Sequence, residues 1–265
     1  MWPESAIARA AELACRIEAT ALKPGNVTPL HSFPRMTYDD FLRSAAAIGP
    51  VLGAAGQARV GEVILRAVRA TRAVAAANTN LGMVLLLAPL AKGAAAASTG
   101  SVEGLRRAVR TVLADLDMQD ARLAYEAIRL ARPGGMGAYV EQDLSTLPSV
   151  TLLEAMTLAK GRDGVAREYA SGYATTFEDA LPLLDGALAQ GHESVDAAVE
   201  VYLGLLARTP DTLVERKHGE RVAREVSARA AAVLACGAAG SVARGASVSA
   251  FDAWLRRAER PLNPG

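Results

Sequence analysis

Residues 59–72 read RVGEVILRAVRATR, and this stretch decides the fold class. Its small and apolar residues recur at the spacing that places them on one face of an α-helix: Val60, Val63, Ile64, Ala67, Val68 and Thr71. The arginines at 59, 66, 69 and 72 fall outside this face, where water can solvate them. The stretch therefore predicts an amphipathic helix with one buried side.

Helical spacing recurs along most of the chain. A stripe over 7–17 ends at the turn sequence KPGN of residues 23–26. Thr37 is expected to be a helix N-cap because acids follow it in the first turn, and an apolar helix is expected from Leu81 onward. Further helices are expected at 101–115, 118–131, 149–160, 177–190, 195–208, 212–235 and 251–259, with an irregular segment at 132–148.

Composition supports the same fold class. The 265 residues include 56 alanines, and aromatic residues make up only 5%. Alanine has the best helix propensity, whereas strands favour β-branched and aromatic residues. With 51% hydrophobic residues the chain can bury a sizeable core. We therefore expect an all-α protein, a single compact multi-helix domain over residues 1–265.

Charge and cysteine content narrow the functional class. Lys and Arg number 29 against 28 for Asp and Glu, so no basic surplus favours nucleic acid. The apolar run 81–91 is too short for a membrane helix and contains Pro89. Cys15 and Cys236 lack the spacing of a disulfide framework or zinc site, and the N-terminus lacks the apolar stretch of a signal peptide. We expect a cytoplasmic protein with no membrane partner.

Three polar segments could bind an anionic ligand. Lys23 and Asn26 flank a rigid Pro-Gly turn, so an exposed turn could present both to a phosphate; an ordinary helix stop explains them equally well. Asn78, Thr79 and Asn80 precede the apolar helix, where they either bind an anion or cap that helix.

The third segment is DTLVERKHG at 211–219. Asp211 lies near one helix face with Glu215 and His218, and Arg216 and Lys217 add cations. A metal-triphosphate needs this mixture of charges, although surface charge on a helix is the alternative. A smaller cluster of the same kind contains Glu168.

Taken in order, several short motifs resemble the triphosphoribosyl-dephospho-coenzyme A synthase family. They are KPGNV at 23–27, His31, Met36, FLRSA at 41–45, NTNLG at 78–82, REY at 167–169 with Gly172, DT at 211–212 and LNPG at 262–265. The resemblance spans nearly the whole chain. It implies an all-α transferase that moves the triphosphoribosyl group of ATP to dephospho-coenzyme A and releases adenine.

The resemblance also implies roles for the polar segments. Lys23, Asn26, Arg216 and Lys217 would bind phosphates, and Asp211 would bind a Mg²⁺ ion or activate the acceptor. Glu168 would be a second catalytic carboxylate, and Asn78, Thr79 and Asn80 would form a nucleotide-binding loop. The partners would be small nucleotide substrates, and a homodimer is left open.

The chain departs from the family pattern in two places. The family usually has His and Lys where this chain has Asn80 and Leu81, and it has a further helix after the Pro-Gly at which this sequence stops. We therefore expect a divergent branch of the family, in which the last helix is either lacking or follows the residue at which this sequence stops. Two alternatives stay open: transfer to another acceptor, such as a pterin- or furan-type precursor of a one-carbon cofactor, and a nucleotide-binding subunit without catalysis.

Overall fold

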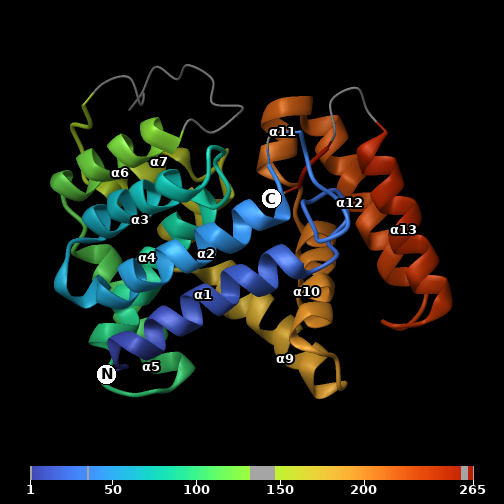
Figure 1. The fold of residues 1–265 in the computed structure, drawn as a ribbon, viewed down its shortest axis with the longest axis horizontal. Helices are drawn as coiled ribbons and strands as arrows, with labels where there is room; N and C mark the ends of the chain where they lie inside the picture. Colours follow the sequence, from blue (N-terminus) through green and yellow to red (C-terminus); the bar gives the residue numbers. More distant parts are fainter. Residues whose placement is uncertain (1, 35, 132–146, 258–261, 265) are drawn as a thin grey trace. The chain divides into compact units, whose positions relative to one another are not determined.

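The computed structural model describes residues 2–34, 36–131, 147–257 and 262–264. Within these ranges the chain forms thirteen α-helices, a 3-10 helix and a π-helix (Figure 1). No strand forms there, and Thr28 pairs with His31 only as an isolated bridge. The all-α fold class is confirmed. Most of the irregular segment expected at 132–148 lies outside the described residues.

The contacts within the chain divide it into two compact units. Unit 1 comprises Met1–Arg16 and Pro34–Ala174, and unit 2 comprises Ile17–Phe33 and Thr175–Gly265. The boundary falls inside helix α1 (Glu4–Thr20), which supplies residues to both units. The expectation of one helical domain stays a prediction.

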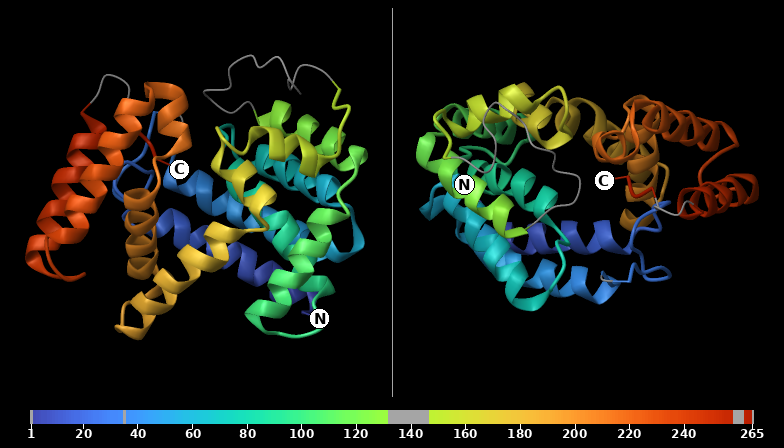
Figure 2. Two further views of the ribbon diagram at one scale, coloured as in Figure 1. Left: turned by 180° about the vertical axis from the view of Figure 1, so that it is seen from behind. Right: turned by 90° about the horizontal axis from the view of Figure 1, so that it is seen from above.

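Unit 1 is built around the helix that residues 59–72 predict. This helix, α3, packs against α2 and α6, and α4 packs against α5 and α3 (Figure 2). The predicted stripe of α3 is buried, from Val60 to Thr71. The helices that lie wholly in unit 1 are α2 (Tyr38–Gly53), α3 (Val60–Val74), α4 (Leu81–Ala96), α5 (Val102–Ala114), α6 (Met118–Ala131), α7 (Leu152–Ala159) and α8 (Gly164–Ser171), with η1 (Ala54–Gln57) after α2.

A glycine allows α3 and α6 to approach closely. A Cβ atom on Gly61 would lie only 2.5 Å from the carbonyl oxygen of Asp120, so no larger residue fits without moving a backbone. Asp120 is buried, and its Oδ1 accepts a hydrogen bond from the Gly61 N–H at 2.8 Å. The side chain of the N-cap residue, Arg59, makes no capping bond. The carboxylate of α6 therefore caps the N-terminus of α3.

A buried tyrosine compensates for a proline inside α4, and a second buried tyrosine bonds the next carbonyl along the helix. Pro89 has no N–H, so the carbonyl of Leu85 lacks its usual helical donor. The Tyr169 hydroxyl donates to this carbonyl at 2.7 Å, and the Tyr173 hydroxyl donates to the carbonyl of Leu86 at the same distance. Tyr173 has a left-handed backbone with φ of 64°, which is unfavourable for tyrosine. Its hydrogen bond and burial offset this strain.

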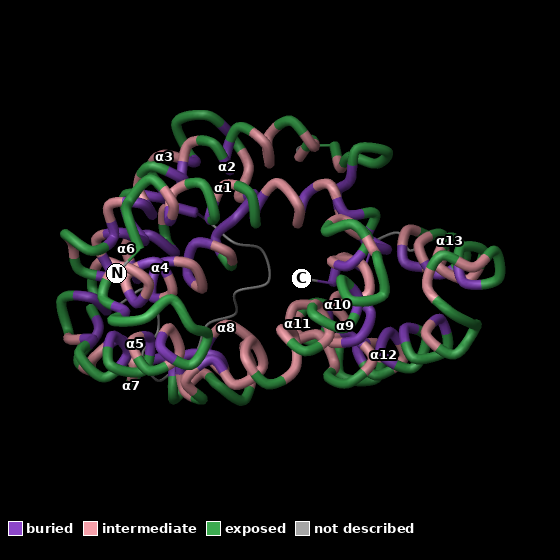
Figure 3. Tube along the Cα trace, turned by 90° about the horizontal axis from the view of Figure 1, so that it is seen from below, coloured by how far each residue is buried: buried purple, intermediate pink, exposed green. Residues whose placement is uncertain are grey.

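Unit 2 has its own hydrophobic core. Ten buried residues form it, including Leu203, Val226, Phe251 and Leu255. Buried and exposed residues alternate along α12 and α13 in Figure 3, as expected for helices that pack on one side only. The elements that lie wholly in unit 2 are η2 (Thr175–Ala180), α9 (Leu181–Ala189), α10 (Ser194–Arg208), α11 (Thr212–His218), α12 (Glu220–Ala235) and α13 (Val242–Arg256).

The observed helices match most of the expected ones and correct others. Thr37 is an N-cap, and Asp40 completes a capping box with it. The single helix expected at 212–235 is wrong, because Gly219 adopts φ of 88° and separates α11 from α12. The sequence pattern missed α8, and α13 begins at Val242, nine residues before the expected start. The expected helix 177–190 begins as the π-helix η2, and that expected at 149–160 begins at Leu152.

Replacing Tyr169 with Phe tests the link between Pro89 and the tyrosines. Tyr169→Phe leaves the Leu85 carbonyl unpaired in the core, so we expect a loss of about 1–3 kcal/mol in the free energy of unfolding. Pro89→Ala restores the missing N–H, so the same change should cost less in that background. Urea unfolding of the two single variants and the double variant measures the coupling.

Tyr173→Phe provides the matched control. Its partner, Leu86, has Leu90 as its regular helical donor, which Pro89 does not remove. Pro89→Ala should therefore change the cost of Tyr173→Phe less. Equal coupling for the two tyrosines would contradict this account of α4.

Candidate functional site

The KPGN turn, residues 23–26, has a conformation that only glycine tolerates at its third position. Gly25 has φ of 80°, and a Cβ atom there would lie 2.9 Å from the carbonyl oxygen of Leu262 and 3.0 Å from Cδ1 of Leu255. The turn thus packs against α13 and the last described residues of the chain. Two motifs from opposite ends of the sequence, KPGNV and LNPG, meet in unit 2.

An ion pair on α13 holds this turn. Asp252 accepts from the Gly25 N–H at 2.8 Å and from Arg256 Nε at 2.8 Å, and Arg256 also donates to the Asn26 carbonyl at 2.7 Å. Burial, the largest single influence, raises the pKa of Asp252. The hydrogen bonds from Arg256 and Gly25 and the charges of Arg256 and His31 together outweigh it and lower that pKa.

Asn26 and Pro24 of the turn also form hydrogen bonds with other parts of unit 2. The Asn26 side chain donates to the carbonyl of Pro264 at 3.0 Å and, more weakly, to that of Pro24 at 3.3 Å. The hydroxyl of Tyr202, on α10, donates to the Pro24 carbonyl at 2.8 Å. Helices α10 and α13 and the C-terminal residues 262–264 therefore fix the backbone that carries Lys23.

Lys23 is buried, which corrects the exposed turn that the sequence predicts. The residue is 8% exposed, its ammonium pairs with Glu18 of α1, and it lies 5.9 Å from the centre of the Tyr202 ring. A lysine is rarely buried unless its charge is compensated. Here one carboxylate and one aromatic ring compensate it, and the ring contributes through a cation–π contact.

Asp211 lies near the same tyrosine. Burial raises the pKa of Tyr202, and the charges of Asp211 and Asp252 raise it further. Asp211 is the N-cap of α11, and its Oδ1 accepts from the Val214 N–H at 2.7 Å. Tyr202 thus has the KPGN turn and Asp211 as neighbours.

Arg216 and Lys217 follow Asp211 on α11. Although much of the Lys217 side chain is exposed, burial of its ammonium lowers its pKa. The charge of Arg216 lowers this pKa further, whereas that of Asp211 raises it. The three charged residues lie close enough to influence one another, as the sequence spacing predicts.

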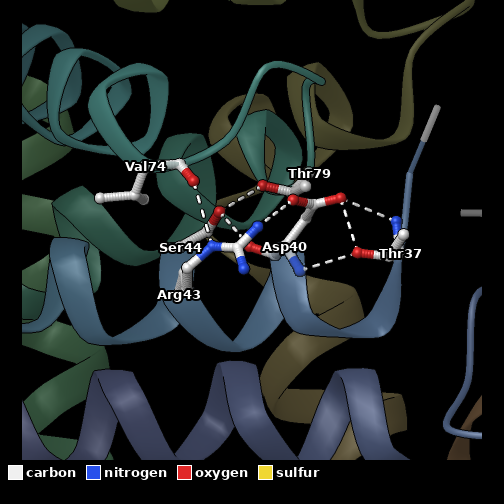
Figure 4. Close-up of polar contacts among 6 residues, drawn as sticks. All are labelled: Thr37, Asp40, Arg43, Ser44, Val74 and Thr79. Atoms are coloured by element: carbon white, nitrogen blue, oxygen red, sulfur yellow. Dashed lines mark hydrogen bonds and ion pairs between the residues drawn. The ribbon is translucent and has the colours of Figure 1, made fainter.

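The loop formed by Asn78, Thr79 and Asn80 lies in unit 1, where hydrogen bonds attach it to three helices. Asn78 Oδ1 accepts from the Leu81 N–H at 3.1 Å, which caps α4. Thr79 donates to Ser44 of α2 at 2.7 Å (Figure 4). Asn80 Oδ1 accepts from Thr71 of α3 at 3.0 Å. For Asn78 the structure therefore shows the capping role.

Ser44 and its neighbours extend this network along α2. Ser44 Oγ donates to the carbonyl of Asp40 at 2.6 Å, and Arg43 bonds both the Asp40 carboxylate and the carbonyl of Val74, the last residue of α3 (Figure 4). One buried atom of the network is left without a partner within the described ranges. Asn80 Nδ2 is buried and has no hydrogen-bond partner among the described residues.

Glu168 is the other predicted carboxylate of unit 1. It is buried on α8 and lies close to Tyr173. Burial raises the pKa of Tyr173, and the charges of Tyr169 and Glu168 add to the effect. Glu168 is thus associated with the tyrosines that support α4.

The structure divides the predicted site residues between the two units. Lys23, Asn26, Asp211, Arg216 and Lys217 belong to unit 2, whereas Asn78, Thr79, Asn80 and Glu168 belong to unit 1. The roles of all nine as site residues stay predictions.

Sequence reasoning missed four residues around the KPGN turn: Glu18, Tyr202, Asp252 and Arg256. The i,i+4 spacing of Asp252 and Arg256 is visible in the sequence, but nothing local indicates that this pair reaches a turn 227 positions earlier.

Neither a cluster of metal ligands nor a membrane-spanning helix is found among the described residues. They contain no group of three or more His, Cys, Asp or Glu side chains that could hold a metal ion. None of the helices in the described ranges is long and apolar enough to cross a membrane.

Comparison with known proteins identifies the class of protein. The family model of the ATP:dephospho-CoA triphosphoribosyl transferases, CitG, matches residues 4–265. The chain therefore belongs to this family of transferases, as the motifs predict.

A solved structure agrees with this assignment. It is the crystal structure of a protein from Archaeoglobus fulgidus that carries the provisional name triphosphoribosyl-dephospho-CoA synthase. The two chains are 25% identical and superpose with a TM-score of 0.56, over 83% of this chain and 99% of the other. No curated protein sequence gives a significant match.

Asp252→Asn tests the bond that holds the KPGN turn. The substitution removes the charge of a carboxylate that accepts hydrogen bonds from Arg256 and from the Gly25 N–H. We therefore expect the free energy of unfolding at pH 7 to fall by about 2 kcal/mol. The folded pKa of Asp252 lies below its unfolded value, so its contribution is present in full above about pH 4 and is lost as pH falls through the folded pKa. Denaturant unfolding from pH 3 to pH 7 should show the two proteins converging in acid.

Asp179→Asn is the control for this comparison, because the Asp179–Arg208 pair of unit 2 is about half exposed. It should cost less than about 1 kcal/mol. An Asp252→Asn protein as stable as the wild type at pH 7 would contradict the anchoring role of the ion pair.

Proposed function

We propose that this protein moves the triphosphoribosyl group of ATP to a hydroxyl of dephospho-CoA and releases adenine. The match of residues 4–265 to the transferase family carries this proposal, and the Archaeoglobus structure supports it. The family description gives ATP as the donor and dephospho-CoA as the acceptor. No observation favours a pterin or furan acceptor, or a subunit without catalysis.

The chemistry sets requirements that residues of unit 2 can meet. Displacing adenine from C1 of the ribose develops positive charge on the sugar and negative charge on the base, while the triphosphate needs cations. We assign Lys23 to the phosphates, because its ammonium is buried yet makes one hydrogen bond, to Glu18, among the described residues. Arg216 and Lys217 supply further cations beside Asp211.

Two further residues of unit 2 have proposed roles, and that of Asn26 differs from the phosphate binding that the sequence predicts. Asn26 shapes the turn through its bonds to Pro24 and Pro264. We propose that Asp211, which caps α11, orients the acceptor hydroxyl.

Magnesium fits this proposal as part of the substrate. The described residues offer no cluster of three ligands, but Mg²⁺ bound to a nucleotide takes most of its ligands from phosphates and water and needs only one or two carboxylates. We therefore propose that ATP arrives as its magnesium complex and that Asp211 adds a carboxylate near it. ATP is a cytoplasmic metabolite, and we place the reaction in the cytoplasm.

Lys23→Met tests the assignment of the phosphate site. The variant loses one charge-assisted contact, so we expect kcat/KM for adenine release to fall about 10- to 100-fold, corresponding to about 1.4–3 kcal/mol. The assay incubates the protein with magnesium-ATP and dephospho-CoA and follows adenine by chromatography. Methionine keeps the bulk of the buried side chain, whereas glutamate at position 23 would place a second carboxylate against Glu18.

Lys160→Met is the matched control, because Lys160 is an exposed lysine at the end of α7. It should leave adenine release unchanged. If the wild-type protein releases no adenine in the presence of both substrates, the proposed function is wrong. If Lys23→Met is folded and fully active, Lys23 does not belong to the site.

A further inference from the structure

Glu18 and Lys23 form an ion pair whose hydrogen-bonding capacity is only partly used. Glu18 Oε1 accepts from the Lys23 ammonium, whereas Glu18 Oε2 is buried and has no hydrogen-bond partner among the described residues. The ammonium has three N–H donors, and within the described chain only this one bond uses them. An unpaired acceptor and unpaired donors therefore lie side by side.

The surrounding structure holds this pair in place. The turn that carries Lys23 is bonded through Pro24 to Tyr202, through Gly25 to Asp252 and through Asn26 to Arg256. Glu18 lies in the last turn of α1, so its backbone is helical. With both backbones fixed, a bound ligand can supply the partners that the described chain does not provide.

Other carboxylates near the turn differ from Glu18. Asp252 accepts from Gly25 and from Arg256, and Asp211 Oδ1 accepts from Val214. Leaving a carboxylate oxygen buried without a donor costs free energy, and sites that bind polar ligands commonly carry such a cost. Glu18 thus has a carboxylate oxygen that is buried and lacks a partner among the described residues, and this oxygen can accept from a ligand.

We propose that Glu18 is a substrate-binding residue that accepts a hydrogen bond from a ribose hydroxyl of ATP, while Lys23 donates to a phosphate oxygen of the same nucleotide. This inference rests on the proposed function for the identity of the nucleotide. A nucleotide carries hydroxyl donors and phosphate acceptors within one small group, which complements a carboxylate beside an ammonium. A site built to bind a hydroxyl should reject an analogue that lacks it.

The test compares ATP with 2′-deoxy-ATP and 3′-deoxy-ATP. Calorimetry measures the three affinities for the wild-type protein, for Glu18→Ala and for Glu18→Asp, which keeps the charge but withdraws the carboxylate. Glu12→Ala is the control, because Glu12 lies on the same helix in a partly exposed pair with Arg16. Wild type and control should bind ATP at least about tenfold more tightly than one of the two analogues, and both Glu18 variants should lose that preference.

Each outcome decides the proposal. A wild-type protein that binds ATP and both analogues equally well would overturn it, and so would Glu18 variants that keep the preference. If Glu18→Ala does not fold, judged by circular dichroism, Glu18→Asp gives the same readout with the charge retained. Adenine release is measured in parallel: binding with the expected preference but without adenine release supports the Glu18 site and contradicts the transferase assignment.

Discussion

The buried ammonium of Lys23 is the constraint on which the candidate site depends. A charge that is mostly removed from water needs fixed partners, and unit 2 provides Glu18 on α1 and the ring of Tyr202 on α10. The backbone under the charge is fixed as well, by Asp252 and Arg256 of α13. Because these partners come from three helices, the position of the Lys23 side chain depends on the packing of α1, α10 and α13. Such preorganisation is what a site for a charged substrate requires.

The two ends of the sequence are linked by this arrangement. Gly25 lies against Leu262, and Asn26 bonds to Pro264, so the KPGN turn is completed by residues at the far end of the chain. The loop at 78–80 is organised differently, because its polar side chains are mostly used in bonds to α2, α3 and α4. It contributes stability to unit 1 through those bonds, and Asn80 Nδ2 is buried without a partner among the described residues.

The sequence predicts those features that depend on neighbouring residues. The stripe of α3 and the cap at Thr37 follow from spacings of three and four, and both are confirmed. The break at Gly219 was missed because a glycine inside a helical pattern is often tolerated, and only its left-handed backbone ends the helix. Asp252 and Arg256 were missed because their partners lie about 230 positions away, and the burial of Lys23 was missed because burial depends on tertiary packing. The family motifs supplied what local patterns could not, namely the activity.

The most direct test of this account is a crystal structure of the protein with magnesium-ATP bound. The account predicts a phosphate oxygen within about 3 Å of Lys23 Nζ, with the KPGN turn and its bonds to Asp252 and Arg256 unchanged. A structure in which ATP is bound with its triphosphate out of reach of Lys23, and in which Lys23 still pairs only with Glu18, would contradict it.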